Sequence, residues 1–137
     1  MIRKAKKQDL NSLFELVKVF ATSFEPKIEP FTRSFEQILD DNNAYVFVAE
    51  EDDKIIGYAL GFIHSTFFAN GNIAWLEEIM VDEKFRRTGI GTALVNAFEQ
   101  VAISVECKLI ALATRRADDF YLSIGYEKSA TYFRKLL

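Results

Sequence analysis

Apolar residues in the first third of the chain follow helical spacing. After Asp9, which can cap a helix, they recur at Leu10, Leu13, Phe14, Val17 and Phe20. Pro26 and Pro30 interrupt this pattern, and Thr32 opens a shorter helix that ends in the polar run at residues 40–43. The spacing therefore predicts two helices joined by an exposed, adaptable loop at residues 24–31.

Runs of β-forming residues dominate the middle of the chain. They cover residues 44–50, 55–66 and 72–81, with short polar turns between them, and a further short strand is predicted at residues 2–5. This arrangement is typical of an antiparallel meander. A third helix then opens at Thr88 to Gly91, carries one apolar face, and leads into a buried strand at residues 109–113. A strand, a helix and a strand in this order predict a parallel crossover.

The last part of the chain is predicted to hold a short helix and a final strand. The helix covers residues 117–124 and stops at Gly125, which suits a left-handed terminus, and the strand covers residues 126–137. The fold class is α/β, with a mixed central sheet of about six to seven strands and about four flanking helices. No linker or internal repeat divides the chain, so residues 1–137 are predicted to form a single domain.

Composition narrows the function classes. Half of the 137 residues are apolar and the formal net charge is −3, so the chain can bury a sizeable core but lacks the basic excess of a nucleic-acid binder. The single Cys107 excludes an internal disulfide and a Cys-rich zinc site. No apolar run is long enough for a membrane span and no secretion signal is present. A cytoplasmic location is expected.

The segment at residues 86–92, Arg-Arg-Thr-Gly-Ile-Gly-Thr, carries the strongest local signal. It lies between a strand and an amphipathic helix, where backbone N–H groups at a helix start can bind phosphate and glycines allow close approach. A dinucleotide fingerprint would need a small residue at Leu94, and a Walker loop would need Gly-Lys-Ser/Thr, so both fit poorly. An ordinary glycine-rich helix start with solvated arginines is the remaining alternative.

This segment resembles the Arg/Gln-x-x-Gly-x-Gly/Ala signature of the GCN5-related N-acetyltransferase (GNAT) superfamily. Residues 79–81 are similar to the family's central strand before that loop, and residues 117–126 are similar to its late Ala-x-x-apolar-Tyr-x-x-x-Gly-aromatic segment. The order of elements agrees as well. The resemblance covers essentially the whole chain, with specific motifs from about Trp75 to Tyr126.

The resemblance implies acetyl-CoA as the cofactor. Backbone N–H groups at residues 87–92 would hold its pyrophosphate, and the backbone at residues 79–81 would pair with the pantetheine arm and polarise the acetyl carbonyl. The cofactor-binding residues implied in this way are Ile79, Met80, Val81, Arg86, Arg87, Thr88, Gly89, Ile90, Gly91, Thr92, Thr114 and Ala117. Thr114 departs from the family, in which an Asn is frequent at this position.

The resemblance also implies a proton donor, and strand position offers two proton acceptors. Tyr121 corresponds to the family's general acid, and a phenol with an ordinary pKa near 10 stays protonated at neutral pH. Glu77 and Glu78 are neighbours on a strand and face opposite ways. Simple alternation places Glu77 with Ile79 and Glu78 with Met80, and a bulge would swap these assignments. Similarity to the Leu-Glu-acidic-x-x-Val run of polyamine acetyltransferases favours Glu77, whereas two solvated charges or a water-relayed base are the alternatives. His64 and Cys107 are expected to be bystanders.

The predicted function is direct transfer of an acetyl group from acetyl-CoA to a primary amine, with a small-molecule acceptor favoured. Neither a nucleic acid nor a membrane is expected as a partner. Acidic residues near the N-terminal helices would suit a cationic acceptor such as a polyamine, although a solvated acidic face explains them equally. The alternatives are a protein or peptide N-terminal acetyltransferase and a non-catalytic acyl-CoA-binding module. Oligomeric state stays open, with a homodimer among the options.

Overall fold

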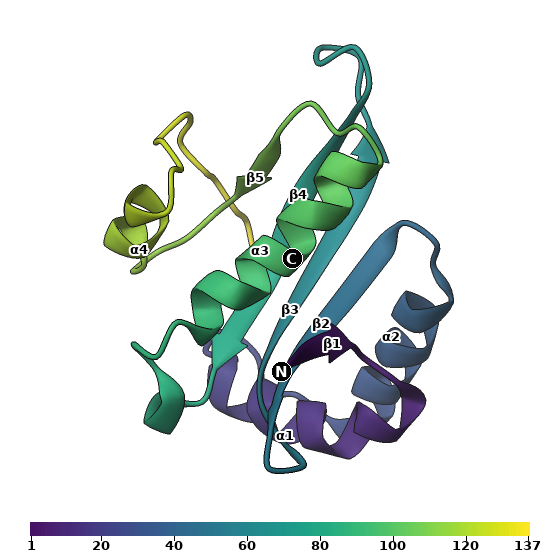
Figure 1. Ribbon diagram of the computed structural model, residues 1–137. Helices are drawn as coiled ribbons and strands as arrows, with labels where there is room; N and C mark the ends of the chain where they lie inside the picture. Colours follow the sequence, from purple (N-terminus) through teal and green to yellow (C-terminus); the bar gives the residue numbers. More distant parts are fainter.

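A five-stranded sheet forms the centre of the computed structural model, which describes residues 1–137 (Figure 1). The strands lie in the order β1-β2-β3-β4-β5. β1 to β4 pair antiparallel, and β5 pairs parallel to β4. Their bounds are Ile2–Lys4 for β1, Ala44–Glu51 for β2, Lys54–Ser65 for β3, Asn72–Val81 for β4 and Ile110–Leu112 for β5. The mixed α/β sheet is therefore confirmed.

Helices cover both faces of this sheet. α1 and α2 pack on one face and α3 crosses the other, while α4 lies beyond β5 (Figure 1). The helices are α1 (Leu10–Phe20), α2 (Ile28–Asp40), α3 (Ile90–Ser104) and α4 (Asp118–Ser123), with 3-10 turns η1 (Lys7–Asp9) and η2 (Glu83–Phe85). No helix combines the length and the apolar character that crossing a membrane requires.

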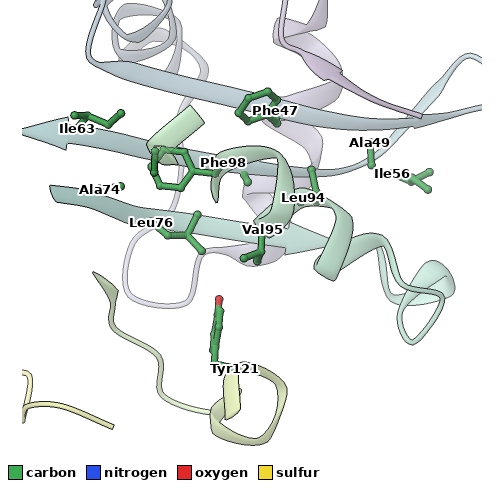
Figure 2. Packing of buried hydrophobic residues seen from close by; sticks show 12 residues of the cluster. Phe47, Ala49, Ile56, Ile63, Ala74, Leu76, Leu94, Val95, Phe98 and Tyr121 are labelled. Atoms are coloured by element: carbon green, nitrogen blue, oxygen red, sulfur yellow. The ribbon is translucent and has the colours of Figure 1, made fainter. Parts of the chain in front are cut away.

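Alternation along the strands divides the core between the two faces. Val48 and Tyr58 contribute to the cluster under α1 and α2, and their strand neighbours Phe47 and Ala59 contribute to the cluster under α3. Phe98 of α3 is 1% exposed and lies at the centre of the second cluster (Figure 2). The sheet is thus buried on both faces, which explains the continuous apolar runs in β2 and β3.

Helix α2 begins earlier than the sequence predicts. The predicted start was Thr32 and the observed start is Ile28, so Pro30 lies inside the first helical turn rather than in a loop. The reason is that proline lacks an N–H, and the N–H groups of a first turn have no intrahelical acceptor in any case. The connecting loop is correspondingly shorter and covers residues 21–27.

The prediction of six to seven strands is wrong because residues 126–137 form no strand. Tyr132 and Phe133 are 62% and 86% exposed, and Arg134 donates a hydrogen bond of 3.0 Å to Ser23 in the loop between α1 and α2. The neighbouring strand β5 has only three residues, so it offers a very short edge for further pairing. β5 is also half-buried rather than buried.

Asp9 caps the turn η1 rather than α1. Its carboxylate accepts a hydrogen bond of 2.7 Å from the Lys6 N–H and two from the Arg3 guanidinium, at 2.8 and 3.0 Å. Arg3 also bonds Glu50 of β2. These contacts tie β1 to the start of α1. Asp9 is the only charged residue among the buried ones, and its charge is balanced by Arg3.

The Asp9 contact predicts a loss of stability in acid. Hydrogen bonds from Arg3 hold the pKa of Asp9 below its ordinary value of 3.8, so the stabilisation is complete above that value and disappears as pH falls through the lower folded-state pKa. We expect Asp9→Asn to lower the free energy of unfolding by about 2 kcal/mol at neutral pH and by much less near pH 2. Urea unfolding of both proteins at the two pH values checks this, and an equal difference at both would contradict it.

Candidate active site

Strand β4 has an unpaired edge beyond the short contact with β5. The two strands pair only from Ala74 to Leu76. Past that point the Asp82 N–H donates to Ile56 of β3 at 2.7 Å, so by the alternation of an antiparallel ladder the peptide groups of Ile79 and Val81 face away from β3. The Ile79 peptide group and the Val81 N–H are therefore open to an extended ligand, whereas the Val81 carbonyl accepts a hydrogen bond from Arg86.

A bulge in β4 sets the direction of the two glutamates. Leu60 of β3 lies opposite Glu78 and Gly61 lies opposite Leu76, which leaves Glu77 as the extra, unpaired residue. Leu76 faces α3, whereas Glu78 shares the opposite face with Met80. Glu77 is exposed. Of the two candidate bases, Glu78 is therefore the one directed under α1 and α2.

The glycine turn before α3 has the geometry of an anion site. Arg87 and Gly89 both have left-handed backbone, with φ of +64° and +88°, and the helix starts at Ile90. Left-handed residues that alternate with residues of ordinary backbone turn successive N–H groups toward one concave surface, here at the positive end of the helix dipole. The residues present therefore suit a phosphate group.

Side chains around this turn bind it to β4 and α4. The Arg86 guanidinium donates to the Val81 carbonyl at 3.1 Å, so it anchors the turn to the end of β4. A methyl group added to Gly91 would lie 3.4 Å from the Phe120 ring, which shows how closely α4 approaches the first turn of α3. The turn, the open edge of β4 and α4 thus border one region.

Tyr121 of α4 points toward β4, with its hydroxyl leading (Figure 2). The residue is 7% exposed, and its ring packs 5.0 Å from Phe120 and 5.6 Å from Tyr126, centroid to centroid. Its hydroxyl makes no hydrogen bond within the chain, yet no buried side-chain oxygen is left unpaired, so this hydroxyl retains access to solvent. Burial raises the pKa of Tyr121 above the ordinary phenol value.

The two other predicted cofactor residues lie at the entry to α4. The Thr114 hydroxyl oxygen accepts a hydrogen bond of 3.1 Å from the Ala117 N–H, which shapes the turn between β5 and α4. Ala117 itself packs against the core under α3. The Thr114 hydroxyl still carries a proton that it can donate to a ligand.

A cavity of about 370 Å³ lies between α1, α2 and the sheet, and Glu78 lines it. The Tyr58 hydroxyl, from a residue only 3% exposed, donates a hydrogen bond of 2.7 Å to Glu78 Oε1. Burial and the charge of Glu78 raise the pKa of Tyr58 far above its ordinary range. The cavity thus contains one carboxylate that a buried phenol holds in place.

The candidate base Glu77 and the two predicted bystanders, His64 and Cys107, lie outside this arrangement. Glu77 is exposed, and His64 is exposed near the end of β3, opposite Ile73. Cys107 is half-buried, and burial raises the pKa of its thiol. A larger hollow of about 590 Å³ on the β1 side of the glycine turn is lined by neither Glu78 nor Tyr121.

Tyr58 was missed by the sequence analysis. Tyr58 lies on β3 two positions from Leu60, so alternation and the register against β4 place it next to Glu78. The only signal in the sequence was a hydroxylated aromatic residue within an otherwise apolar strand. That signal has no meaning until the two strands are paired.

Comparison with known proteins identifies the family. The model of the acetyltransferase (GNAT) family matches residues 10–126, which is most of the chain. The chain belongs to this family. The bovine thialysine N-epsilon-acetyltransferase is 27% identical to it over 142 aligned positions, covering 91% of this chain and 82% of that enzyme. This GNAT protein is therefore an N-acetyltransferase, which transfers an acetyl group to an amine.

Solved structures share the GNAT fold over nearly the whole chain. Glucosamine-6-phosphate N-acetyltransferase from Arabidopsis thaliana is 25% identical, with a TM-score of 0.88 over 99% of this chain and 97% of that one. Aminoglycoside N-acetyltransferase AAC(6')-Iy, whose structure contains CoA, is 23% identical, with a TM-score of 0.86 over 98% of this chain and 93% of that one. GNAT acetyltransferases use acetyl-CoA. The backbone of the glycine turn suits a phosphate group such as this cofactor carries.

Proposed function

We propose that this enzyme transfers the acetyl group directly to the primary amine of a small molecule bound in the cavity under α1 and α2. The observation that carries the proposal is the Glu78 carboxylate, held at 2.7 Å by Tyr58 inside that cavity and next to the bulge of β4. A carboxylate in this position can attract an ammonium group and then accept its proton.

Acetyl-CoA supplies the acetyl group as an activated thioester. On this chain, the N–H groups at residues 87–92 bind its pyrophosphate, and the Ile79 peptide group and the Val81 N–H hold its extended arm at the open edge of β4. Support comes from the left-handed backbone at Arg87 and Gly89 and from the missing strand partner beyond Leu76. Met80 contributes through its backbone, and Thr114 and Ala117 border the same region.

Glu78 is the proton acceptor in this proposal, in place of Glu77. An amine nucleophile must lose a proton, and only Glu78 of the pair lines the cavity, whereas Glu77 is exposed at the bulge. As the amine bonds to the acetyl carbon, the carbon–sulfur bond of the thioester breaks and a CoA thiolate leaves. Tyr121 would donate its proton to that thiolate, because its free hydroxyl faces β4 and its raised pKa keeps it protonated. Cys107 takes no part, which agrees with direct transfer rather than an acetylated thiol.

A matched pair of variants tests the base. We expect Glu78→Gln to lower kcat/KM for the best amine at least tenfold, because its amide cannot accept the proton, and a water relay can replace only part of this function. Glu77→Gln changes the same charge one residue away and should stay within about twofold. CoA release is the measurement. Equal losses in both variants, or a larger loss in Glu77→Gln, would overturn the assignment.

Two further comparisons separate the alternatives. Acetyl-CoA at about 100 times its dissociation constant should stabilise the protein by about 2.7 kcal/mol in a thermal shift, and ATP should not. The enzyme should release CoA faster with a free amine as acceptor than with a peptide whose N-terminal residue matches that amine. Faster turnover of peptides would favour an N-terminal acetyltransferase, and stabilisation without turnover of any amine or peptide would favour a non-catalytic module.

A further inference from the structure

We propose that the acceptor is a primary amine with a single positive charge carried on a compact apolar body, such as an arylalkylamine or alkylamine, rather than a polyamine or an amino sugar. This inference rests on the proposed function and specifies the substrate class of the same cavity. It departs from the polycationic acceptor that the acidic residues near the N-terminal helices suggested.

Most of the cavity wall is apolar. Nine of its fifteen lining residues are hydrophobic, and the wall includes Phe24, Phe31, Phe35, Val17 and Leu60. Phe31 and Phe35 of α2 stack with ring centroids 5.8 Å apart, so this side of α2 presents an aromatic surface, and Phe14 of α1 packs 5.3 Å from Phe31. Such a wall matches an aromatic ring or an alkyl chain.

Two carboxylates line this cavity, and only Glu78 lies on the sheet side, where Tyr58 holds it. Glu25 belongs to the exposed loop at the cavity mouth and forms an ion pair with Lys27 at 3.8 Å. Against the apolar wall, Glu78 is thus the partner for one ammonium group. A second ammonium of a polyamine, or the hydroxyls of a sugar, would lose water against apolar side chains without gaining comparable partners.

The size of the cavity suits a small apolar body. A volume of about 370 Å³ lies at the small end of ligand pockets and accommodates a single ring or a short alkyl chain. Phe24 lies at residues 21–27, the loop between α1 and α2, and is 71% exposed although it lines the cavity. An apolar ligand can therefore bury this ring when it binds.

A panel of amines tests the class. Phenethylamine and hexylamine should be acetylated with kcat/KM at least tenfold above ethylamine, spermidine and glucosamine, because removal of apolar contact in a pocket costs on the order of tenfold or more. A preference for spermidine or glucosamine would overturn this inference and leave the proposed acetyl transfer intact. Absence of turnover for every amine, with acetyl-CoA still bound in a thermal shift, would overturn the proposed function and the inference with it.

Variants at the cavity mouth test the contact itself. Phe24→Ala should lower the ratio of kcat/KM for phenethylamine to that for ethylamine about tenfold. The matched control is Phe67→Ala, which removes a fully exposed ring from the turn between β3 and β4 and should leave the ratio unchanged. Ser34→Asp adds a carboxylate to the α2 side of the cavity wall and should raise relative turnover of spermidine. An unchanged ratio in Phe24→Ala, with spermidine unaffected by Ser34→Asp, would overturn the proposal.

Discussion

Replacement of Tyr121 by phenylalanine should lower kcat by about 10²–10⁴ and leave the fold intact. The substitution removes only the hydroxyl, which bonds no group of the chain, so the ring keeps its packing against Phe120 and Tyr126. What is lost is the proton that Tyr121 holds toward β4. Steady-state CoA release with the best amine gives kcat, and thermal unfolding verifies the fold.

The neighbouring tyrosine provides a control for this result. Tyr126→Phe also removes a phenol hydroxyl from the aromatic cluster, but that hydroxyl bonds Glu99 of α3 at 3.0 Å. This variant should lose about 1 kcal/mol of stability and keep its turnover. Turnover of Tyr121→Phe within twofold of the unchanged enzyme would contradict the acid assignment. So would equal loss of turnover in both variants.

The pH profile offers a second measure of the same residue. Burial raises the pKa of Tyr121 above its ordinary value of 10, so the donor stays protonated through neutral and mildly alkaline solution. Loss of activity through deprotonation of Tyr121 should therefore appear only above pH 10. If kcat of the unchanged enzyme already declined as the pH was raised slightly above neutral, and kcat of Tyr121→Phe did not, this role would be contradicted.

Phe98→Ala should lower the free energy of unfolding by about 3–5 kcal/mol. Phe98 is 1% exposed, and its ring lies so close to β3 that a methyl group added to Gly61 would come within 2.3 Å of it. Removal of the ring opens a cavity between α3 and the sheet that the strand backbone cannot fill. Urea unfolding monitored by circular dichroism gives the value.

Ile103 is the matched control on the same helix. Its side chain is 67% exposed, so Ile103→Ala should change stability by no more than about 0.5 kcal/mol. Gly61→Ala approaches the same contact from the strand side and should also destabilise, because the added methyl collides with the ring. A loss below about 1 kcal/mol in Phe98→Ala would contradict the central packing role of this ring.

Most of the fold was predictable from local patterns. The strands at 44–51, 54–65 and 72–81 agree with the predicted runs to within a residue, and α3 begins where the glycine turn predicts. Apolar residues at every second position mark a strand, and apolar residues at helical spacing mark a helix. Both signals are local because they reflect only which side of one element is buried. The left-handed φ of +99° at Gly125 was also predicted, since glycine is the residue that ends a helix in this way.

The last strand was mispredicted for a non-local reason. Residues 126–137 contain β-forming aromatics, and local propensity alone favours a strand. A strand, however, needs a partner edge, and β5 offers only three residues of one. Availability of a partner is decided by how the rest of the sheet is assembled.

The sequence by itself predicted a phosphate site for the cofactor, and the tertiary structure decided which residues line the cavity proposed for the acceptor. Phosphate binding depends on consecutive backbone groups at a helix start, so the segment at residues 86–92 predicts it directly. The choice between Glu77 and Glu78 depends on a bulge opposite Leu60, which only pairing of two strands creates. The cavity is lined by α1, α2 and three strands, and its apolar character is a property of their packing that no single segment of the chain contains.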